Sequence, residues 1–126
     1  MLSKLFSKGS EEKISWNRLN DLSQLDEIDE SSKETPVLIF KHSTSCGISA
    51  MALNRFERNY DHQTTIKPYY LDLLSYRDIS NEISTRYSVR HESPQVLVIK
   101  EGKATYHNSH NGIDFTAIDE FVKEQQ

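Results

Sequence analysis

Hydrophobic residues recur along the chain in two spacings, and each spacing predicts one type of secondary structure. Short continuous apolar runs are typical of buried strands, and they occur at 37–41, 69–72 and 95–100. Apolar residues three or four positions apart are typical of amphipathic helices, and this spacing predicts helices at 22–28, 46–60, 78–87 and 115–122. In the second of these helices, Ile48, Ala52, Phe56 and Tyr60 form one apolar stripe.

Turn and capping residues divide these elements. Ile14 and Trp16 alternate with polar neighbours and predict a short edge strand. Asp114 is expected to cap the last helix, and either Asp21 or Ser23 the first. Glu101 and Gly102 predict a tight turn into a further strand at 103–107, so that strand should form a hairpin with 95–100.

The resulting order of elements is β-α-β-α-β-α-β-β-α. Alternating strands and helices imply parallel crossovers, and the late hairpin makes the sheet mixed. This is the layout of an α/β protein with the thioredoxin-like fold, in which a mixed central sheet is flanked by helices. A fold alone does not establish a function.

Composition limits the class of protein. A chain of 126 residues predicts a single domain, placed at 14–126, after a flexible N-terminal lead at 1–13. With 36% hydrophobic and 27% charged residues, the chain fits neither a disordered nor a membrane protein. The net charge of −4 provides no overall basic field for nucleic acid. No apolar run is long enough to span a membrane, and 1–13 lacks the apolar core of a secretory signal.

Cys46 is the only cysteine of the chain. It cannot form an internal disulfide, which excludes a disulfide-stapled secreted fold and favours the cytoplasm. It lies where a helix is predicted to begin, and there unpaired N–H groups and the helix dipole stabilise a thiolate. A free cysteine is commonly a small buried apolar residue, but the polar loop around Cys46 favours a reactive thiol.

Two further positions fit a thiol-exchange site around Cys46. Ser49 stands where Cys-x-x-Cys oxidoreductases have their resolving cysteine, and its hydroxyl could donate a hydrogen bond to a thiolate but could not attack a mixed disulfide. Ser93–Pro94 precedes a strand, and an X-Pro bond adopts the cis form at modest cost. In thioredoxin folds a cis-proline at this place faces the reactive cysteine. A proline that simply starts a strand explains Pro94 equally well.

Several polar residues near this predicted site could contact a ligand. They are Lys41, Ser45, Arg90, His91, Ser93, Gln95, Ser109 and His110, and Gly47 leaves the sulfur sterically open. No metal site is predicted, because the five histidines lack tight ligand spacing, although His107 and His110 are three residues apart.

Three segments resemble the YtxJ-like, or C-type, monothiol bacilliredoxins of Gram-positive bacteria. They are 45–49 (Ser-Cys-Gly-Ile-Ser), 89–95 (Val-Arg-His-Glu-Ser-Pro-Gln) and 109–113 (Ser-His-Asn-Gly-Ile). The stretch from Tyr70 to Ser80, with Asp72, Arg77 and Asp78, also fits. The likeness runs from about Ile14 to the last helix, and its most specific part is 91–95. Two positions depart from it: Gly47 stands where many relatives have Pro or Ala, and Asn111 where an aromatic residue is expected.

The resemblance implies an oxidoreductase that removes bacillithiol, a cysteine–glucosamine–malate conjugate, from mixed disulfides with client proteins. Cys46 would attack the mixed disulfide, release the client thiol and carry bacillithiol until a second bacillithiol or a reductase regenerates it. Bacillithiol would be a co-substrate, and no cofactor is implied. Its two malate carboxylates could pair with Lys41, Arg90 or His91. We expect a monomer without nucleic-acid or membrane partners.

Two other functions stay open on the sequence alone. Residues 46–49 differ from the Cys-Gly-Phe-Ser motif of monothiol glutaredoxins only at Ile48, and those proteins can carry a [2Fe–2S] cluster. Against this reading, Asn111-Gly112 is a poor substitute for the Gly-Gly pair that follows the hairpin in glutaredoxins. The other alternative is a non-catalytic interaction module with this fold, for which Cys46→Ala would leave function unchanged.

Overall fold

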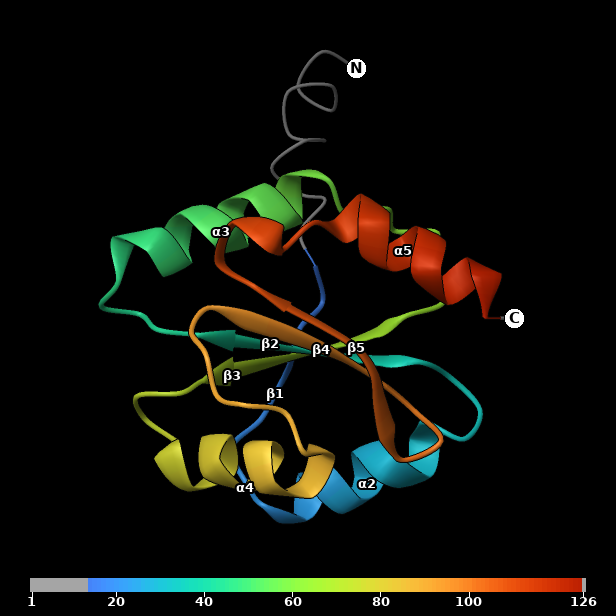
Figure 1. The fold of residues 1–126 in the computed structure, drawn as a ribbon, viewed down its shortest axis with the longest axis horizontal. Coiled ribbons are helices and arrows are strands. Elements are labelled where there is room, and N and C mark those ends of the chain that lie inside the picture. Colours follow the sequence, from blue (N-terminus) through green and yellow to red (C-terminus); the bar gives the residue numbers. More distant parts are fainter. Residues whose placement is uncertain (1–13, 126) are drawn as a thin grey trace, which may run out of the picture.

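A mixed sheet of five strands forms the centre of the fold (Figure 1). The computed structural model describes residues 14–125, so the lead predicted at 1–13 lies outside the described residues. The strands are β1 (Asn17–Arg18), β2 (Val37–His42), β3 (Lys67–Asp72), β4 (Gln95–Lys100) and β5 (Lys103–Ser109). Their order across the sheet is β1-β3-β2-β4-β5. β3 pairs in parallel with β1 and β2, whereas β4 is antiparallel to β2 and β5.

Helices cover both faces of the sheet. Figure 1 shows α3 (Gly47–Arg58) and α5 (Phe115–Glu124) on one face, and α2 (Ser23–Ser31) and α4 (Arg77–Tyr87) on the other. Because side chains alternate along a strand, β2 contributes to two cores. Leu38 and Phe40 pack with α3 and α5, while Val37 and Ile39 pack with α2 and α4. This is the α/β arrangement that the sequence predicted.

Most of the predicted boundaries are confirmed. The turn at Glu101 and Gly102 joins β4 to β5, and both residues have positive φ (53° and 74°), as a tight hairpin turn requires. The Asp114 side chain accepts a hydrogen bond from the Thr116 N–H at 3.3 Å and so caps α5. In α4, the apolar residues spaced by four are buried, as expected.

The predicted edge strand at Ile14 and Trp16 is displaced. The paired strand β1 is two residues long and begins after Trp16. Ile14 is buried and the Trp16 ring stacks on Phe56, with 6.0 Å between centroids. The Trp16 indole N–H also donates to Glu57 at 3.0 Å. The alternating pattern thus reflects packing against α3 rather than strand pairing.

The apolar stripe predicted for α3 is wrong at its first member. Ile48 is 60% exposed, whereas Ser49, Ala52 and Phe56 are the buried residues of this helix. Residues four apart advance about 40° around a helix at each step, because one turn takes about 3.6 residues. Ile48 therefore rotates away from the face that Phe56 occupies, and Ser49 takes the buried position.

Candidate active site

Cys46 is the N-cap residue of α3, with extended backbone (φ −115°, ψ 122°). Its carbonyl accepts the first helical hydrogen bond, from the Ala50 N–H at 3.0 Å. Cys46 is partly exposed, and within residues 14–125 its sulfur makes no hydrogen bond. A Cβ on the adjacent Gly47 would meet no atom within 4 Å, so the space there is open. The thiol is thus accessible and lies beside the unpaired N–H groups of the first helical turn.

The loop before β4 reaches the same edge of the sheet as Cys46. β2 and β4 are antiparallel, with Lys41 opposite Gln95. The chain that leaves β2 toward Cys46 therefore neighbours the chain that enters β4, and Figure 1 shows both loops at one side of the molecule. The Ser93–Pro94 peptide bond in the second loop is cis. The structure thus brings Pro94 and Cys46 to one edge.

Ser49 is fully buried beneath the turn that carries Cys46. Its hydroxyl oxygen accepts a hydrogen bond from the Ser43 N–H at 3.0 Å and lies 2.7 Å from His42 Nδ1. Burial lowers the pKa of His42, and the negative charges of Asp72 and Glu57 partly oppose this shift. The Ser49 hydroxyl is therefore engaged with the turn at 42–43 and not with the sulfur.

Lys41 has no exposed surface, which is rare for a lysine. Its ammonium donates to Gln95 Oε1 at 3.1 Å and lies 2.8 Å from His91 Nδ1. Burial lowers the pKa of Lys41 to about 8. Burial and the charges of Lys41 and Arg77 also lower the pKa of His91. Because Lys41 is enclosed and His91 is exposed, Lys41 would act on a ligand through His91.

The cis-proline loop is tied to the end of β5. The His110 N–H donates to the Pro94 carbonyl at 3.1 Å. The Ser109 hydroxyl donates to the Glu92 carboxylate, and this bond is the main reason that the pKa of Glu92 is lowered. His110 Nδ1 lies 3.9 Å from the same carboxylate. These contacts fix the loop that faces the start of α3.

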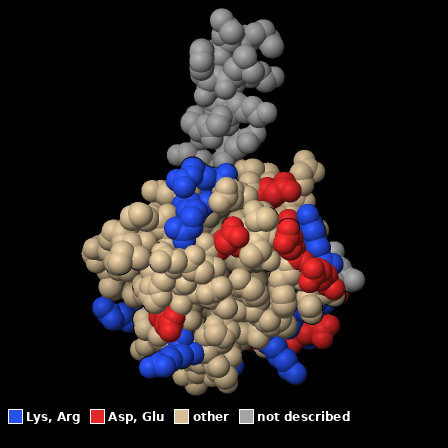
Figure 2. Space-filling model, turned by 45° about the horizontal axis from the view of Figure 1, so that its top comes forward, with Lys and Arg blue, Asp and Glu red and all other residues tan. Residues whose placement is uncertain are grey.

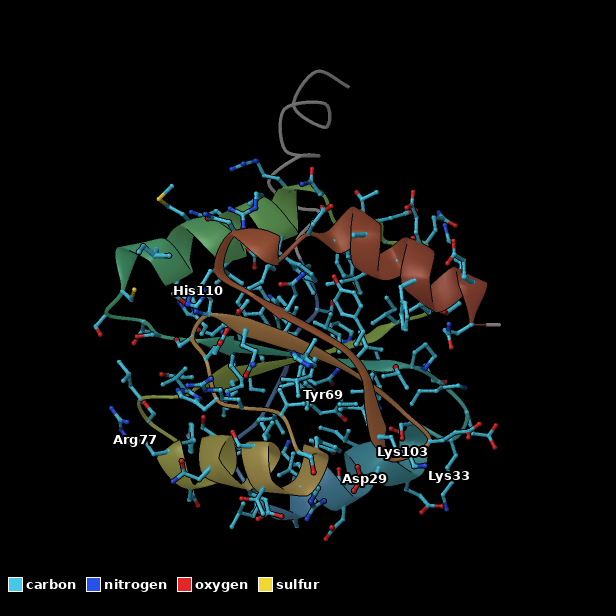
Figure 3. All side chains as sticks on the ribbon, in the orientation of Figure 1. Asp29, Lys33, Tyr69, Arg77, Lys103 and His110 are labelled. Carbon is cyan, nitrogen blue, oxygen red and sulfur yellow. The ribbon has the colours of Figure 1, made fainter. Side chains whose placement is uncertain are left out.

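The remaining predicted site residues differ in exposure. Ser45, Arg90 and His110 are exposed, and Figure 3 shows His110 at the same side of the molecule as the start of α3. Gln95 is buried and donates to the Arg90 carbonyl at 2.9 Å. The Ser93 hydroxyl is buried and has no hydrogen-bond partner among residues 14–125.

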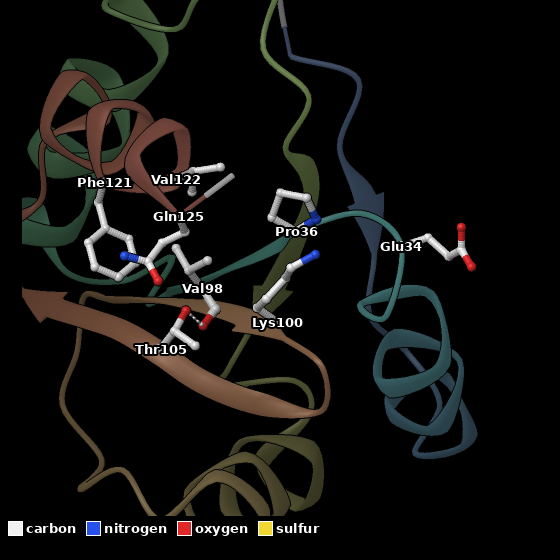
Figure 4. A pocket seen from close by; sticks show the side chains of 8 residues that line it. All are labelled: Glu34, Pro36, Val98, Lys100, Thr105, Phe121, Val122 and Gln125. Carbon is white, nitrogen blue, oxygen red and sulfur yellow. Dashed lines mark hydrogen bonds between the residues drawn. The ribbon is translucent and has the colours of Figure 1, made fainter.

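Two hollows differ in their relation to Cys46. One, of about 240 Å³, lies between α3 and the short helix η1 (His110–Gly112). The other, of about 270 Å³, lies under α5 (Figure 4). Lys100, at the end of β4 away from Pro94, helps to line it, and its lining includes no cysteine or histidine. Of these two hollows, the first is the one lined by α3, the helix that begins at Cys46.

Arg55 was not singled out from the sequence, and Arg77 and Ser80 were noted only within the stretch 70–80 that fits the family, without a role at the site. Arg55 donates to the carbonyls of His110, in η1, and of Ile113, directly after it, and lines the hollow there. Arg77 acts on His91 through its charge, and the Ser80 hydroxyl lies 3.5 Å from His91 Nδ1. Helical spacing could have identified Arg55 from the sequence. It lies seven residues after Ile48, which places both on the same face of the predicted helix.

Within 14–125, no three His, Cys, Asp or Glu side chains are grouped so that they could hold a metal ion. No helix in the same range is both long and apolar enough to cross a membrane.

The fold and the site can be compared with known proteins. A family model described as "Monothiol bacilliredoxin BrxC" matches residues 17–118. A solved structure described as a candidate oxidoreductase with a thioredoxin fold is 28% identical, with a TM-score of 0.71, and the match covers 86% of this chain and 92% of that one.

Two thioredoxins support the fold at lower identity. Thioredoxin from Fasciola hepatica is 19% identical with a TM-score of 0.63, and the match covers 87% of this chain and 99% of that one. Oxidised mitochondrial thioredoxin 3 from Saccharomyces cerevisiae is 19% identical with a TM-score of 0.61, and the coverages are 87% and 95%. The thioredoxin-like fold expected from the order of elements is thereby confirmed.

The family match spans the site as well as the fold. Residues 17–118 include Cys46, Ser49 and the cis-proline loop at 91–94. The chain has one cysteine, so it is a monothiol redox protein. Fold and family together make it a thioredoxin-like thiol oxidoreductase. The chain belongs to the monothiol bacilliredoxin family, as its sequence resemblance predicted.

Proposed function

We propose that this protein removes bacillithiol from mixed disulfides with client proteins, using Cys46 as its nucleophile. The observation that carries the proposal is the accessible Cys46 at the start of α3, in a chain without a second cysteine. With no resolving cysteine, a mixed disulfide on Cys46 can be cleaved only by a thiol from outside the chain. The family description supplies the identity of that thiol.

The reaction consists of two thiol–disulfide exchanges. In the first, the Cys46 thiolate attacks the bacillithiol sulfur of the mixed disulfide. A bond forms between these two sulfurs, the bond to the client sulfur breaks, and the client leaves as a thiolate that takes a proton from solvent. In the second, a bacillithiol thiolate attacks the same sulfur, which yields bacillithiol disulfide and the Cys46 thiolate. Electrons move only between sulfurs, so no cofactor is needed.

The surroundings of Cys46 suit the first exchange. Cys46 lies at the N-terminus of α3 and is partly exposed, so its sulfur is open to an incoming disulfide. The cis-proline loop would form the opposite wall for the incoming disulfide, with the unpartnered Ser93 hydroxyl beside it. Lys41 would add positive potential for an anionic substrate, and the exposed His91 ring, 2.8 Å from its ammonium, would make the contact. We place the reaction in the cytoplasm and assign it to a monomer.

Mass spectrometry of the intact protein tests this proposal. After incubation with a bacillithiolated client, we expect one bacillithiol adduct on Cys46 and one free client thiol per turnover. Cys46→Ser should abolish both, whereas Ser15→Ala, a change at an exposed serine outside the site, should retain both. Equal client release by Cys46→Ser would refute the proposal. A brown protein after anaerobic purification would instead favour an iron–sulfur carrier.

A further inference from the structure

The hollow between α3 and η1 begins at Ile48, two residues after the reactive cysteine that caps α3. Its α3 wall consists of Ile48, Met51, Ala52 and Arg55, and its other wall of His110 and Asn111. The α3 residues are spaced by three or four, so they form one face of the helix. Ile48 and Met51 are 60% and 67% exposed, although both are apolar. The hollow therefore runs along α3 from the cysteine toward Arg55, over an apolar floor.

Arg55 is a positioned cation at the far end of this hollow. Its Nη2 donates to the carbonyls of His110 and Ile113, both at 3.2 Å, which orients the guanidinium. Nη1 makes no hydrogen bond within residues 14–125, and no carboxylate there lies within ion-pair distance of Arg55. In Figure 2, blue atoms gather near the end of α3, whose last turn carries Arg55 and Arg58. Such a guanidinium is well suited to a carboxylate.

The wall formed by η1 is fixed before any ligand arrives. Besides its bonds to Arg55, η1 is held by the His110 N–H, which donates to the Pro94 carbonyl at 3.1 Å. Gly112 lies so close to the Asn108 side chain that a Cβ at this position would overlap it. A preformed hollow loses less entropy on binding than one that must be ordered.

The length of α3 between the cysteine and Arg55 matches the length of bacillithiol. From Gly47 to Arg55 the helix rises about 12 Å, at about 1.5 Å per residue. About ten covalent bonds separate the bacillithiol sulfur from its farther malate carboxyl carbon, which in an extended chain also span about 12 Å. With its sulfur at Cys46, the malate would reach Arg55 and the sugar would lie over Ile48 and Met51.

We propose that this hollow is the bacillithiol subsite and that Arg55 pairs with a malate carboxylate. The inference rests on the proposed function and adds the residue that recognises the acidic end of the thiol. Arg55 is better placed than Lys41 for this role, because the Lys41 ammonium is enclosed and already bonded to Gln95.

A comparison of two disulfides tests the subsite. Cys46 adduct formation is timed with bacillithiol disulfide and with the disulfide of cysteinyl-glucosamine, which lacks malate. The wild type should react about tenfold faster with bacillithiol disulfide at low concentration, as expected for one charge-assisted contact. Arg55→Gln should abolish most of this preference, and Arg55→Lys should restore part of it. Arg58→Gln, on the same helix but outside the hollow, should keep the preference.

The possible outcomes separate the subsite from the function. If bacillithiol disulfide modifies Cys46 but the wild type shows no preference for malate, the subsite is overturned and the proposed function stands. The same holds if Arg55→Gln slows both disulfides equally, because that would be a structural effect of releasing η1. If wild-type Cys46 reacts with neither disulfide, the subsite and the proposed function are overturned together.

Discussion

Ser49 shows how one residue in the Cys-x-x-Ser motif can support the site without touching the sulfur. Its hydroxyl accepts the Ser43 N–H and contacts His42, and the side chain is fully buried. Because the turn at 42–46 carries the cysteine, Ser49 fixes the position of Cys46 through the backbone. We therefore expect the loss of the Ser49 hydroxyl to lower the stability of the protein more than the reactivity of Cys46.

We predict that Ser49→Ala lowers the free energy of unfolding by about 1–3 kcal/mol, because it leaves the buried Ser43 N–H without an acceptor. Urea denaturation of the wild type and the variant measures this cost. Ser45→Ala, at an exposed position, should change stability by less than about 0.5 kcal/mol. A variant as stable as the wild type but with a slower alkylation of Cys46 would instead identify Ser49 as a direct hydrogen-bond donor to the thiolate.

Lys41 gives the protein a pH-dependent stability. Its pKa of about 8 in the folded protein is below the ordinary value of 10.5, because burial disfavours the ammonium. Between these values the unfolded chain binds more protons than the folded one, so stability must rise with pH. This is the opposite of the behaviour of a lysine that gains a carboxylate partner.

We predict that the stability difference between wild type and Lys41→Met shifts by roughly 3 kcal/mol in favour of the wild type from pH 8 to 10.5. Chemical denaturation at a series of pH values measures it, and the subtraction removes other titrating groups. Lys103→Met, at an exposed position, should show no such shift. A constant difference for Lys41→Met would mean that the buried amine titrates normally.

At the scale of elements, the features that could be predicted from the sequence are those that depend on a few adjacent residues. The turn at Glu101 and Gly102, the Asp114 cap and the buried face of α4 each depend on a few adjacent residues, and each is confirmed. Predictions failed where distant packing decides the outcome. Trp16 precedes β1 because its ring packs on α3. The prediction for Ile48 failed for a different reason, because residues four apart drift around the helix and leave Ile48 off the face of Phe56.

The same distinction applies to the site. The place of Cys46 at a helix start follows from the sequence around it. The contacts that surround it do not, since Lys41 and His91 are 50 residues apart and Arg55 and Ile113 are 58 apart. Such pairs are set by strand register and helix packing, which one sequence does not reveal. Arg55 meets the Ile113 carbonyl because the fold packs η1 against α3.

At the scale of the whole molecule, cations without a carboxylate partner lie near the site, although the net charge is negative. The chain carries a net charge of −4, and α2 contributes four carboxylates: Asp26, Glu27, Asp29 and Glu30. Near the site, by contrast, Lys41, Arg55 and Arg77 have no carboxylate within ion-pair distance among residues 14–125. The Glu92 carboxylate in the cis-proline loop opposes them, but it is engaged by Ser109 and lies 3.9 Å from His110. An anionic substrate would therefore meet cations that no ion pair neutralises.

The salt dependence of the reaction rate shows whether the substrate responds to the cations near the site or to the net negative charge of the protein. At physiological ionic strength charges are screened beyond about 8 Å, so the cations near the site should outweigh the distant carboxylates. We predict that added salt slows the reaction of Cys46 with anionic bacillithiol disulfide several-fold, measured by stopped flow under second-order conditions. Hydroxyethyl disulfide, which is uncharged, should react at a rate nearly independent of salt. If salt accelerates the bacillithiol reaction instead, repulsion by the net negative charge governs the encounter, and the cations near Cys46 do not attract the substrate.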